Sequence, residues 1–308
     1  MSELASEPMT STRGAVLDPP RTVAGAGTSA APHRKEPKRW GLTAVGVVVA
    51  LVFLAPYLIM LTGSLKSRQE ILKVPPEYLP TDVKLDNFIN MWGTPETPLP
   101  DNLLSTVVIS LGGTLLALLA ALPAAYYTAR HNFRLKLPFM LLVLVTQMLQ
   151  PTVLASGLFR EFVTLEINDT WLAMILVNAA FNLSFAVWIM HSFFATVPKE
   201  IEEAAWLDGC SRTQSMRQIM LPLVWPGIVT AIIFTFIACW NEFAASLILL
   251  PTDTNQPLTV ALTRFIGQYE SAWQYVFAIS LIGILPVVAL FAMIEKHLVS
   301  GLTAGGVK

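Results

Sequence analysis

Charged side chains are scarce in this chain. Asp, Glu, Lys and Arg make up 13% of its 308 residues, whereas hydrophobic residues make up 54%. A soluble domain carries about twice that share of charge, and the mean hydropathy here is +0.58. These proportions exclude an ordinary water-soluble globular protein and predict a chain that lies largely within a membrane.

Cysteines and cofactor motifs are also sparse. The two cysteines, Cys210 and Cys239, fall in a predicted connecting segment and a predicted helix, so we expect no disulfide. The sequence has no zinc-ligand spacing, no Walker A loop and no dinucleotide fingerprint. We therefore expect a chain that is not an enzyme, has no catalytic residue, binds no metal or cofactor by itself and has no nucleic acid partner.

Long apolar runs dominate the rest of the sequence. A helix crosses the bilayer core with roughly 20 apolar residues, and such runs must be helical because lipid offers backbone groups no water. Six runs are long enough, near residues 41–62, 103–128, 138–158, 171–194, 221–249 and 275–295. The sequence predicts an all-α membrane protein with six transmembrane helices over residues 40–298.

The two ends of the chain have a different composition. Residues 1–39 are rich in Ser, Thr, Ala, Gly and Pro, which is typical of disorder, so we expect an unstructured N-terminal tail. Residues 299–308 are expected to form a short C-terminal tail. Lys and Arg gather before the first run, between runs two and three, and between runs four and five. This bias predicts that both termini are cytoplasmic.

An acidic segment between runs four and five is typical of a helix, a sharp turn and a second helix. Pro198 suits the first position of a helix, and Gly209 suits the positive φ that ends one. Ala204 and Ala205 have little bulk, so another surface can approach them closely. The first turns of the predicted helix hold three acidic residues, Glu200, Glu202 and Glu203. The positive end of the helix dipole favours negative charge at these positions. The segment is either a helix at the membrane surface or a docking element. Its few Lys and Arg residues favour docking.

The same segment resembles a motif of ABC importer permeases. The motif E-A-A-x-x-D-G, with L-P further on, matches Glu203, Ala204, Ala205, Asp208, Gly209, Leu221 and Pro222. Cys210 stands where the family usually has Ala. Other matches follow in order: Tyr126, Ala129 and Arg130; Pro151; Asn168 and Thr170; the W-N-E-F of residues 240–243; and the G-L-T-A-G-G-V-K of residues 301–308. The last two narrow the resemblance to carbohydrate importers, close to the smaller permease of maltose-type importers.

The resemblance implies both a fold and a function. The fold would be that of a type I ABC importer permease with a cytoplasmic coupling helix, in a bacterial inner membrane. The chain would form half of a heterodimeric pore in an ATP-driven, binding-protein-dependent importer of a sugar or polyol. Its partners would be lipid, a second homologous permease, two ATPase subunits that use ATP and Mg, and an extracytoplasmic sugar-binding protein. The implied ATPase contacts are Glu203, Ala204, Ala205, Asp208 and Gly209, and the tail residues Gly305 and Lys308.

Polar residues within the predicted spans leave several interpretations open. Such residues are costly in lipid and often functional. Asn178 and Asn182 share one helix face because they are four residues apart, and Asn241 and Glu242 are adjacent in the next predicted span. Three roles are open for these residues: they could line a pore, form contacts between subunits, or join neighbouring helices by hydrogen bonds. A buried carboxylate would also suit the alternative function, an ion-gradient-driven secondary transporter. The segments 63–100 and 250–273 are candidates for contact with the binding protein.

Overall fold

The computed structural model describes residues 40–93, 97–149, 151–267 and 271–304. It divides into two units, residues 1–50 and 51–308. In the first unit only residues 40–50 are described, and they form the start of helix α1 (Trp40–Ser64). The expected tail 1–39 and the residues Gly305 and Lys308 lie outside the described part of the chain.

Helices and turns make up the described part of the second unit. Within it, β character is confined to one isolated bridge between Ile266 and Ser271. The expected all-α class is confirmed. The elements after α1 are α2 (Arg68–Ile71), α3 (Asp86–Asn90), η1 (Met91–Gly93), α4 (Leu99–Arg130), α5 (Lys136–Met148), α6 (Pro151–Thr164), α7 (Trp171–Thr196), α8 (Lys199–Leu207), α9 (Arg212–Ser215), the π-helical turn η2 (Met216–Met220), α10 (Leu221–Leu223), α11 (Trp225–Trp240), α12 (Ala244–Leu249), α13 (Leu258–Ala261), η3 (Leu262–Phe265) and α14 (Trp273–Ala304).

Four of the described helices are long and apolar enough to cross a membrane. They are Thr43–Ser64 within α1, all of α4 and α7, and Trp273–Met293 within α14. The number rises to six if each of two bent pairs is one span, namely α5 with α6 and Arg212–Leu223 with α11. The apolar runs over 138–158 and 221–249 are therefore bent rather than straight helices, and a membrane crossing by each of them stays a prediction.

The breaks in these spans have chemical causes. α6 begins at Pro151, whose ring has no N–H and therefore suits a helix start. Pro226 lies in the first turn of α11, just after a 77° bend. α14 continues to Ala304, beyond the end of its apolar span at Met293, so the segment from residue 299, expected as a cytoplasmic tail, begins as helix and its location stays a prediction. Each residue added to an existing helix gains a backbone hydrogen bond, which favours this extension.

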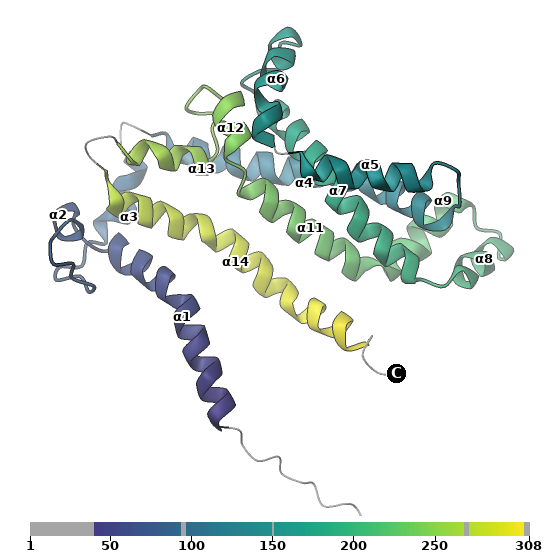
Figure 1. Ribbon diagram of the computed structural model, residues 1–308, viewed down its shortest axis with the longest axis horizontal. Coiled ribbons are helices and arrows are strands. Elements are labelled where there is room, and N and C mark those ends of the chain that lie inside the picture. Colours follow the sequence, from purple (N-terminus) through teal and green to yellow (C-terminus); the bar gives the residue numbers. More distant parts are fainter. Residues whose placement is uncertain (1–39, 94–96, 150, 268–270, 305–308) are drawn as a thin grey trace, which may run out of the picture. The chain divides into compact units, whose positions relative to one another are not determined.

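Helices α4, α7 and α11 pack side by side at the centre of the second unit (Figure 1). Small residues allow close approach: a Cβ added to Gly113 of α4 would lie 2.9 Å from Asn178 Cβ in α7 and 3.3 Å from the Cys239 sulfur in α11. Lipid gives apolar helices little hydrophobic reason to associate, so close van der Waals packing takes that place. The three helices therefore form a tightly packed core.

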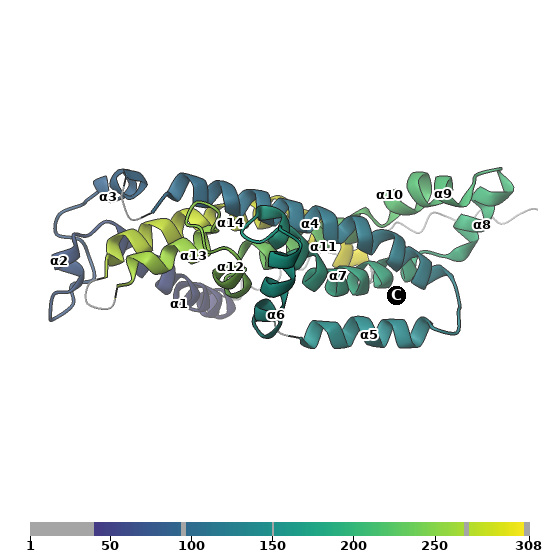
Figure 2. The same ribbon diagram turned by 90° about the horizontal axis from the view of Figure 1, so that it is seen from above.

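The connecting elements gather at opposite ends of this core. α8 and α9 lie at the end where α4 finishes, whereas α3 and α13 lie at the end where α4 begins (Figure 2). Hydrogen bonds support this arrangement, since Asn102 near the start of α4 contacts the 253–256 loop, and Tyr126 near its end contacts Glu202 of α8. A movement of α4 would therefore displace connecting elements at both ends of the helical core.

The contact of α11 with α7 makes a testable prediction. A Cβ added to Gly227 would lie 2.6 Å from Phe193 Cδ2 and 2.8 Å from its Cβ, so Gly227→Ala forces the helices apart and should cost about 1–3 kcal/mol. The control is Gly157→Ala in α6, where an added Cβ meets nothing within 4 Å. Thermal unfolding in detergent should show a lower Tm for Gly227→Ala alone. Equal Tm values for the two variants would contradict the packing.

Candidate functional site

The predicted helix–turn–helix is present at α8 and α9. α8 carries Glu200 and Glu202 in its first turn. After it ends, Gly209 adopts a φ of +90° and its N–H donates to the Trp206 carbonyl at 3.1 Å. A reciprocal capping box between Ser211 and Gln214 then starts α9. The one local difference is Pro198, which precedes the helix rather than opening it.

The two faces of α8 have different surroundings. Glu203, Ala204 and Asp208 are exposed, and the Leu207 side chain is 89% exposed. Ala205, in contrast, is only 4% exposed. Of the two alanines expected to meet a partner, Ala204 is therefore on the open face, whereas Ala205 lies on the face that the chain itself covers, and its contact with an ATPase stays a prediction.

The inner face of α8 holds a charged residue that the sequence analysis did not assign. Glu202 is 2% exposed; its carboxylate accepts a hydrogen bond from the Tyr126 hydroxyl and lies 3.0 Å from Arg130 Nε. The Arg130–Glu202 contact is an ion pair rather than a linear hydrogen bond. In the sequence, Tyr126 and Arg130 stand out only because they match a motif of ABC importer permeases. Their spacing of four residues on one helix face was the available signal of a shared partner.

The asparagines of α7 lie inside the chain. Asn178 is 2% exposed and faces Gly113 of α4. Asn182 donates to the Asn178 carbonyl at 2.9 Å and to the Cys239 sulfur at 3.5 Å. Packing of α4 and α11 against α7 covers Asn178, which favours the third interpretation, hydrogen bonding or packing between helices; a pore-lining or inter-subunit role stays an untested prediction.

Glu242 lies in the break between α11 and α12 rather than within a span. Its carboxylate accepts hydrogen bonds from the backbone N–H groups of Ala245 at 2.7 Å and Ser246 at 3.0 Å, and from the Ser246 hydroxyl at 2.6 Å. These donors begin α12, where the helix itself supplies no acceptors. Of the interpretations left open, this geometry supports a structural role for Glu242.

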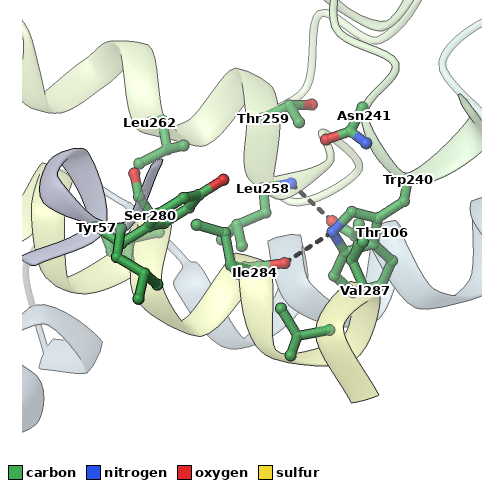
Figure 3. A pocket seen from close by; sticks show the side chains of 14 residues that line it. Tyr57, Thr106, Trp240, Asn241, Leu258, Thr259, Leu262, Ser280, Ile284 and Val287 are labelled. Atoms are coloured by element: carbon green, nitrogen blue, oxygen red, sulfur yellow. Dashed lines mark hydrogen bonds between the residues drawn. The ribbon is translucent and has the colours of Figure 1, made fainter. Parts of the chain in front are cut away.

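Asn241, its neighbour, is exposed and lines a cavity of about 460 Å³. The cavity lies between the second half of α1, the end of α11, α13 and α14 (Figure 3). Its lining is mostly apolar, with Tyr57, Thr259 and Ser280 among the polar exceptions. The Trp240 indole N–H donates to the Gly283 carbonyl at 3.0 Å and thereby fixes one wall.

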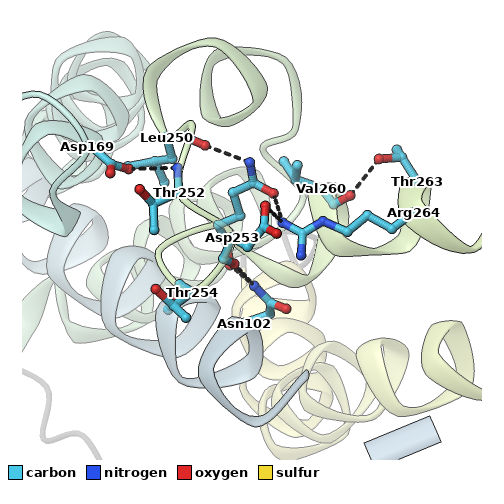
Figure 4. Close-up of polar contacts among 11 residues, drawn as sticks. Asn102, Asp169, Leu250, Thr252, Asp253, Thr254, Val260, Thr263 and Arg264 are labelled. Atoms are coloured by element: carbon cyan, nitrogen blue, oxygen red, sulfur yellow. Dashed lines mark hydrogen bonds and ion pairs between the residues drawn. The ribbon is translucent and has the colours of Figure 1, made fainter. Parts of the chain in front are cut away.

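The loop before α13 is held at its base by polar contacts (Figure 4). The Asn102 amide donates to the carbonyls of Asp253 at 2.6 Å and Gln256 at 2.8 Å. Arg264 pairs with the Asp253 carboxylate at 2.7 Å, and the Thr252 N–H donates to the Asp169 carboxylate at 3.2 Å. Residues 251–254 themselves are exposed. The loop is therefore presented in a fixed conformation at the end of the core opposite α8.

These features define a multi-pass helical membrane protein with an exposed acidic helix at one end and a braced loop at the other. Residues 113–301 match the family of binding-protein-dependent transport system inner membrane components, and the chain belongs to this family. The match covers α4 from Gly113 onward, all of α7 and α11, the α8–α9 segment and most of α14. It confirms the resemblance that the sequence motifs indicated.

Individual relatives agree with this assignment. The inner membrane ABC transporter permease protein YcjP of Escherichia coli (strain K12) is 31% identical over 84% of this chain and 92% of its own length. The trehalose/maltose transport system permease protein MalG of Thermococcus litoralis is 30% identical over 88% and 97%. A solved bacterial ABC transporter involved in the import of alginate matches 83% of this chain and 95% of its own with a TM-score of 0.70 at 20% identity. That structure supports the fold.

The turn at Gly209 makes a second prediction. A side chain at a φ of +90° is strained by about 1–3 kcal/mol, so Gly209→Val should open the turn without affecting membrane insertion. Trypsin should then cleave inserted protein after Arg212 about tenfold faster. Cys210→Ala, which leaves Gly209 in place, should match the wild type. Unchanged cleavage of Gly209→Val would show that the turn tolerates a side chain.

Proposed function

We propose that this chain is the permease subunit of an ATP-driven importer of a sugar or polyol. The observation that carries the proposal is the exposed, preformed α8–Gly209–α9 segment in a member of a binding-protein-dependent family. One relative is named for trehalose and maltose, and the similar solved transporter is involved in the import of alginate, which together favour a carbohydrate substrate. ATP and Mg are then bound by a partner, consistent with the absence of a nucleotide motif in this sequence.

The outer face of α8 is the proposed contact with an ATPase subunit. Glu203 and Asp208 offer carboxylates, Ala204 permits close approach, and Leu207 offers an apolar side chain that is 89% exposed. ATP binding closes the ATPase dimer and moves α8, and the helices change between inward-open and outward-open arrangements. Such coupling requires contacts that differ between two states.

The remaining partners follow the same proposal. A second, homologous permease completes the pore. Two ATPase subunits lie on the cytoplasmic side of the membrane, where both termini of this chain also lie, and a binding protein contacts the opposite side. The braced loop with exposed residues 251–254 suits that contact. Gly305 and Lys308 are proposed to contact the ATPase.

Reconstitution tests the function directly. Proteoliposomes holding this chain, its partner permease, the ATPase and the binding protein would be offered labelled maltose, trehalose, glucose and mannitol. We expect uptake of at least one compound that requires ATP, resists an uncoupler and stops when a catalytic residue of the ATPase is replaced. Uptake that collapses with the uncoupler and persists without ATP would contradict the proposal.

The two alanines of α8 give a matched pair for the docking surface. In a chain with Cys210 and Cys239 replaced by Ser, Ala204→Cys should form a disulfide with a cysteine in the ATPase cleft. Ala205→Cys should crosslink at least about tenfold more slowly, because that side chain is 4% exposed and disulfide exchange depends on access. Crosslinking of Ala204→Cys to the binding protein instead would refute both the orientation and the docking role.

A further inference from the structure

The last turns of α4 carry two side-chain pairs that reach toward α8 and α9. Tyr126 and Arg130 form one i,i+4 pair, and Tyr127 and His131 form the next. The first pair contacts Glu202 of α8. In the second, the Tyr127 and His131 rings stack with centroids 4.5 Å apart, and His131 contacts α9. The end of α4 thus touches both helices of the docking segment.

The inner contact is fully enclosed. The side chains of Arg130 and Glu202 are 6% and 3% exposed, so each charge depends on the other for compensation. Arg130 also donates through Nη1 to the Val197 carbonyl at 2.9 Å, and through Nη2 to the Met220 sulfur at 3.5 Å. One guanidinium therefore joins α4 to the α7–α8 connection, to α8 and to η2.

The outer contact adds a second point of attachment. Arg212 of α9 lies 2.9 Å from His131 Nε2 through its Nη1. A guanidinium can only donate, so His131 Nε2 is the acceptor in this contact. The same guanidinium lies 5.2 Å from the centroid of the Trp206 ring in α8, within the range of a cation–π contact. Arg212 therefore holds α8, α9 and the end of α4 together.

We propose that the end of α4 carries movements of the α8–α9 segment into the membrane core, with Arg130, Glu202 and Tyr126 as its positioning residues. By chain connection, α8 follows only α7, through Val197–Pro198, and α9 leads only to α11, through the η2 turn, whose Met216 and Met220 pack in the same hydrophobic cluster as Tyr126 of α4. α4, in contrast, packs along both α7 and α11. This role rests on the proposed docking of α8 to an ATPase, and it makes α8, α9 and α4 one rigid body.

The test measures whether α4 and α9 keep a fixed separation. Spin labels would be placed at Leu119→Cys in α4, which is 61% exposed, and at the exposed Thr213→Cys in α9, in a chain with Cys210 and Cys239 replaced by Ser. The whole transporter in nanodiscs would be examined with and without ATP and Mg. With the native positioning residues, the inter-label distance should be narrow and the same in both conditions.

Variants at the contact should release this constraint. Glu202→Gln removes the charge at nearly constant volume and should raise the population with a changed or broadened distance about tenfold on ATP addition. Tyr126→Phe removes one hydrogen bond and should give a smaller rise. Arg130→Lys keeps the charge but cannot reach all its partners. The exposed Glu200→Gln of α8 is the matched control and should leave the distance unchanged.

The outcomes separate this inference from the proposed function. If Glu202→Gln does not assemble, Tyr126→Phe decides the question. A narrow, ATP-independent distance in the assembled Glu202→Gln or Tyr126→Phe transporter, with the Ala204→Cys crosslink to the ATPase intact, would overturn the α4 role alone. Loss of that crosslink with the native positioning residues would instead overturn the proposed docking and the α4 role that rests on it.

Discussion

Backbone hydrogen bonding in an apolar environment is the constraint on which this structure depends. Lipid offers no partner for a free N–H or carbonyl, so the apolar runs form helices. Where a helix breaks, another group must replace the missing partner, and at two breaks in this chain a side chain does so. Glu242 does this for the first N–H groups of α12, and the Thr106 hydroxyl accepts from the Leu258 N–H at 2.7 Å where α13 begins. The breaks are therefore built features of the chain rather than defects in a span.

The same reasoning applies more strongly to charge at the end of α4. An unpaired buried charge costs far more than an unpaired amide, so Arg130 and Glu202 are stable there only as a pair with further partners. A pair of this kind is weak evidence for stability, but it fixes geometry, because removing either partner leaves a charge uncompensated at a cost of about 3–5 kcal/mol. The Arg130–Glu202 pair thus fixes the position of α8 relative to α4 more precisely than packing of the short apolar side of α8 could.

Local features of the α8–α9 segment could be predicted from the sequence, whereas its partners within the chain could not. The acidic first turn and Gly209 act through neighbouring backbone groups, so α8 and its turn follow from a few adjacent residues. The burial of Glu202 depends instead on where α4 ends, and no periodicity in nine residues reveals that. The break at residues 241–243 was missed because the apolar residues on both sides outweigh Asn241 and Glu242 in any average over a span. Glu242 ahead of Ala245 and Ser246 is a helix-start signal only once a break there is considered.

The division of α8 into two faces follows from these constraints. Its inner residue Glu202 contacts α4, and changing it alters how the helix is held. Its outer residues make few contacts within the chain, so their identities are free to suit another surface. A helix that had to satisfy both requirements on one face could not change one contact without losing the other. Placing Glu202 inward and Glu203 outward, at adjacent positions about 100° apart around the axis, lets one short helix be anchored and exposed at once.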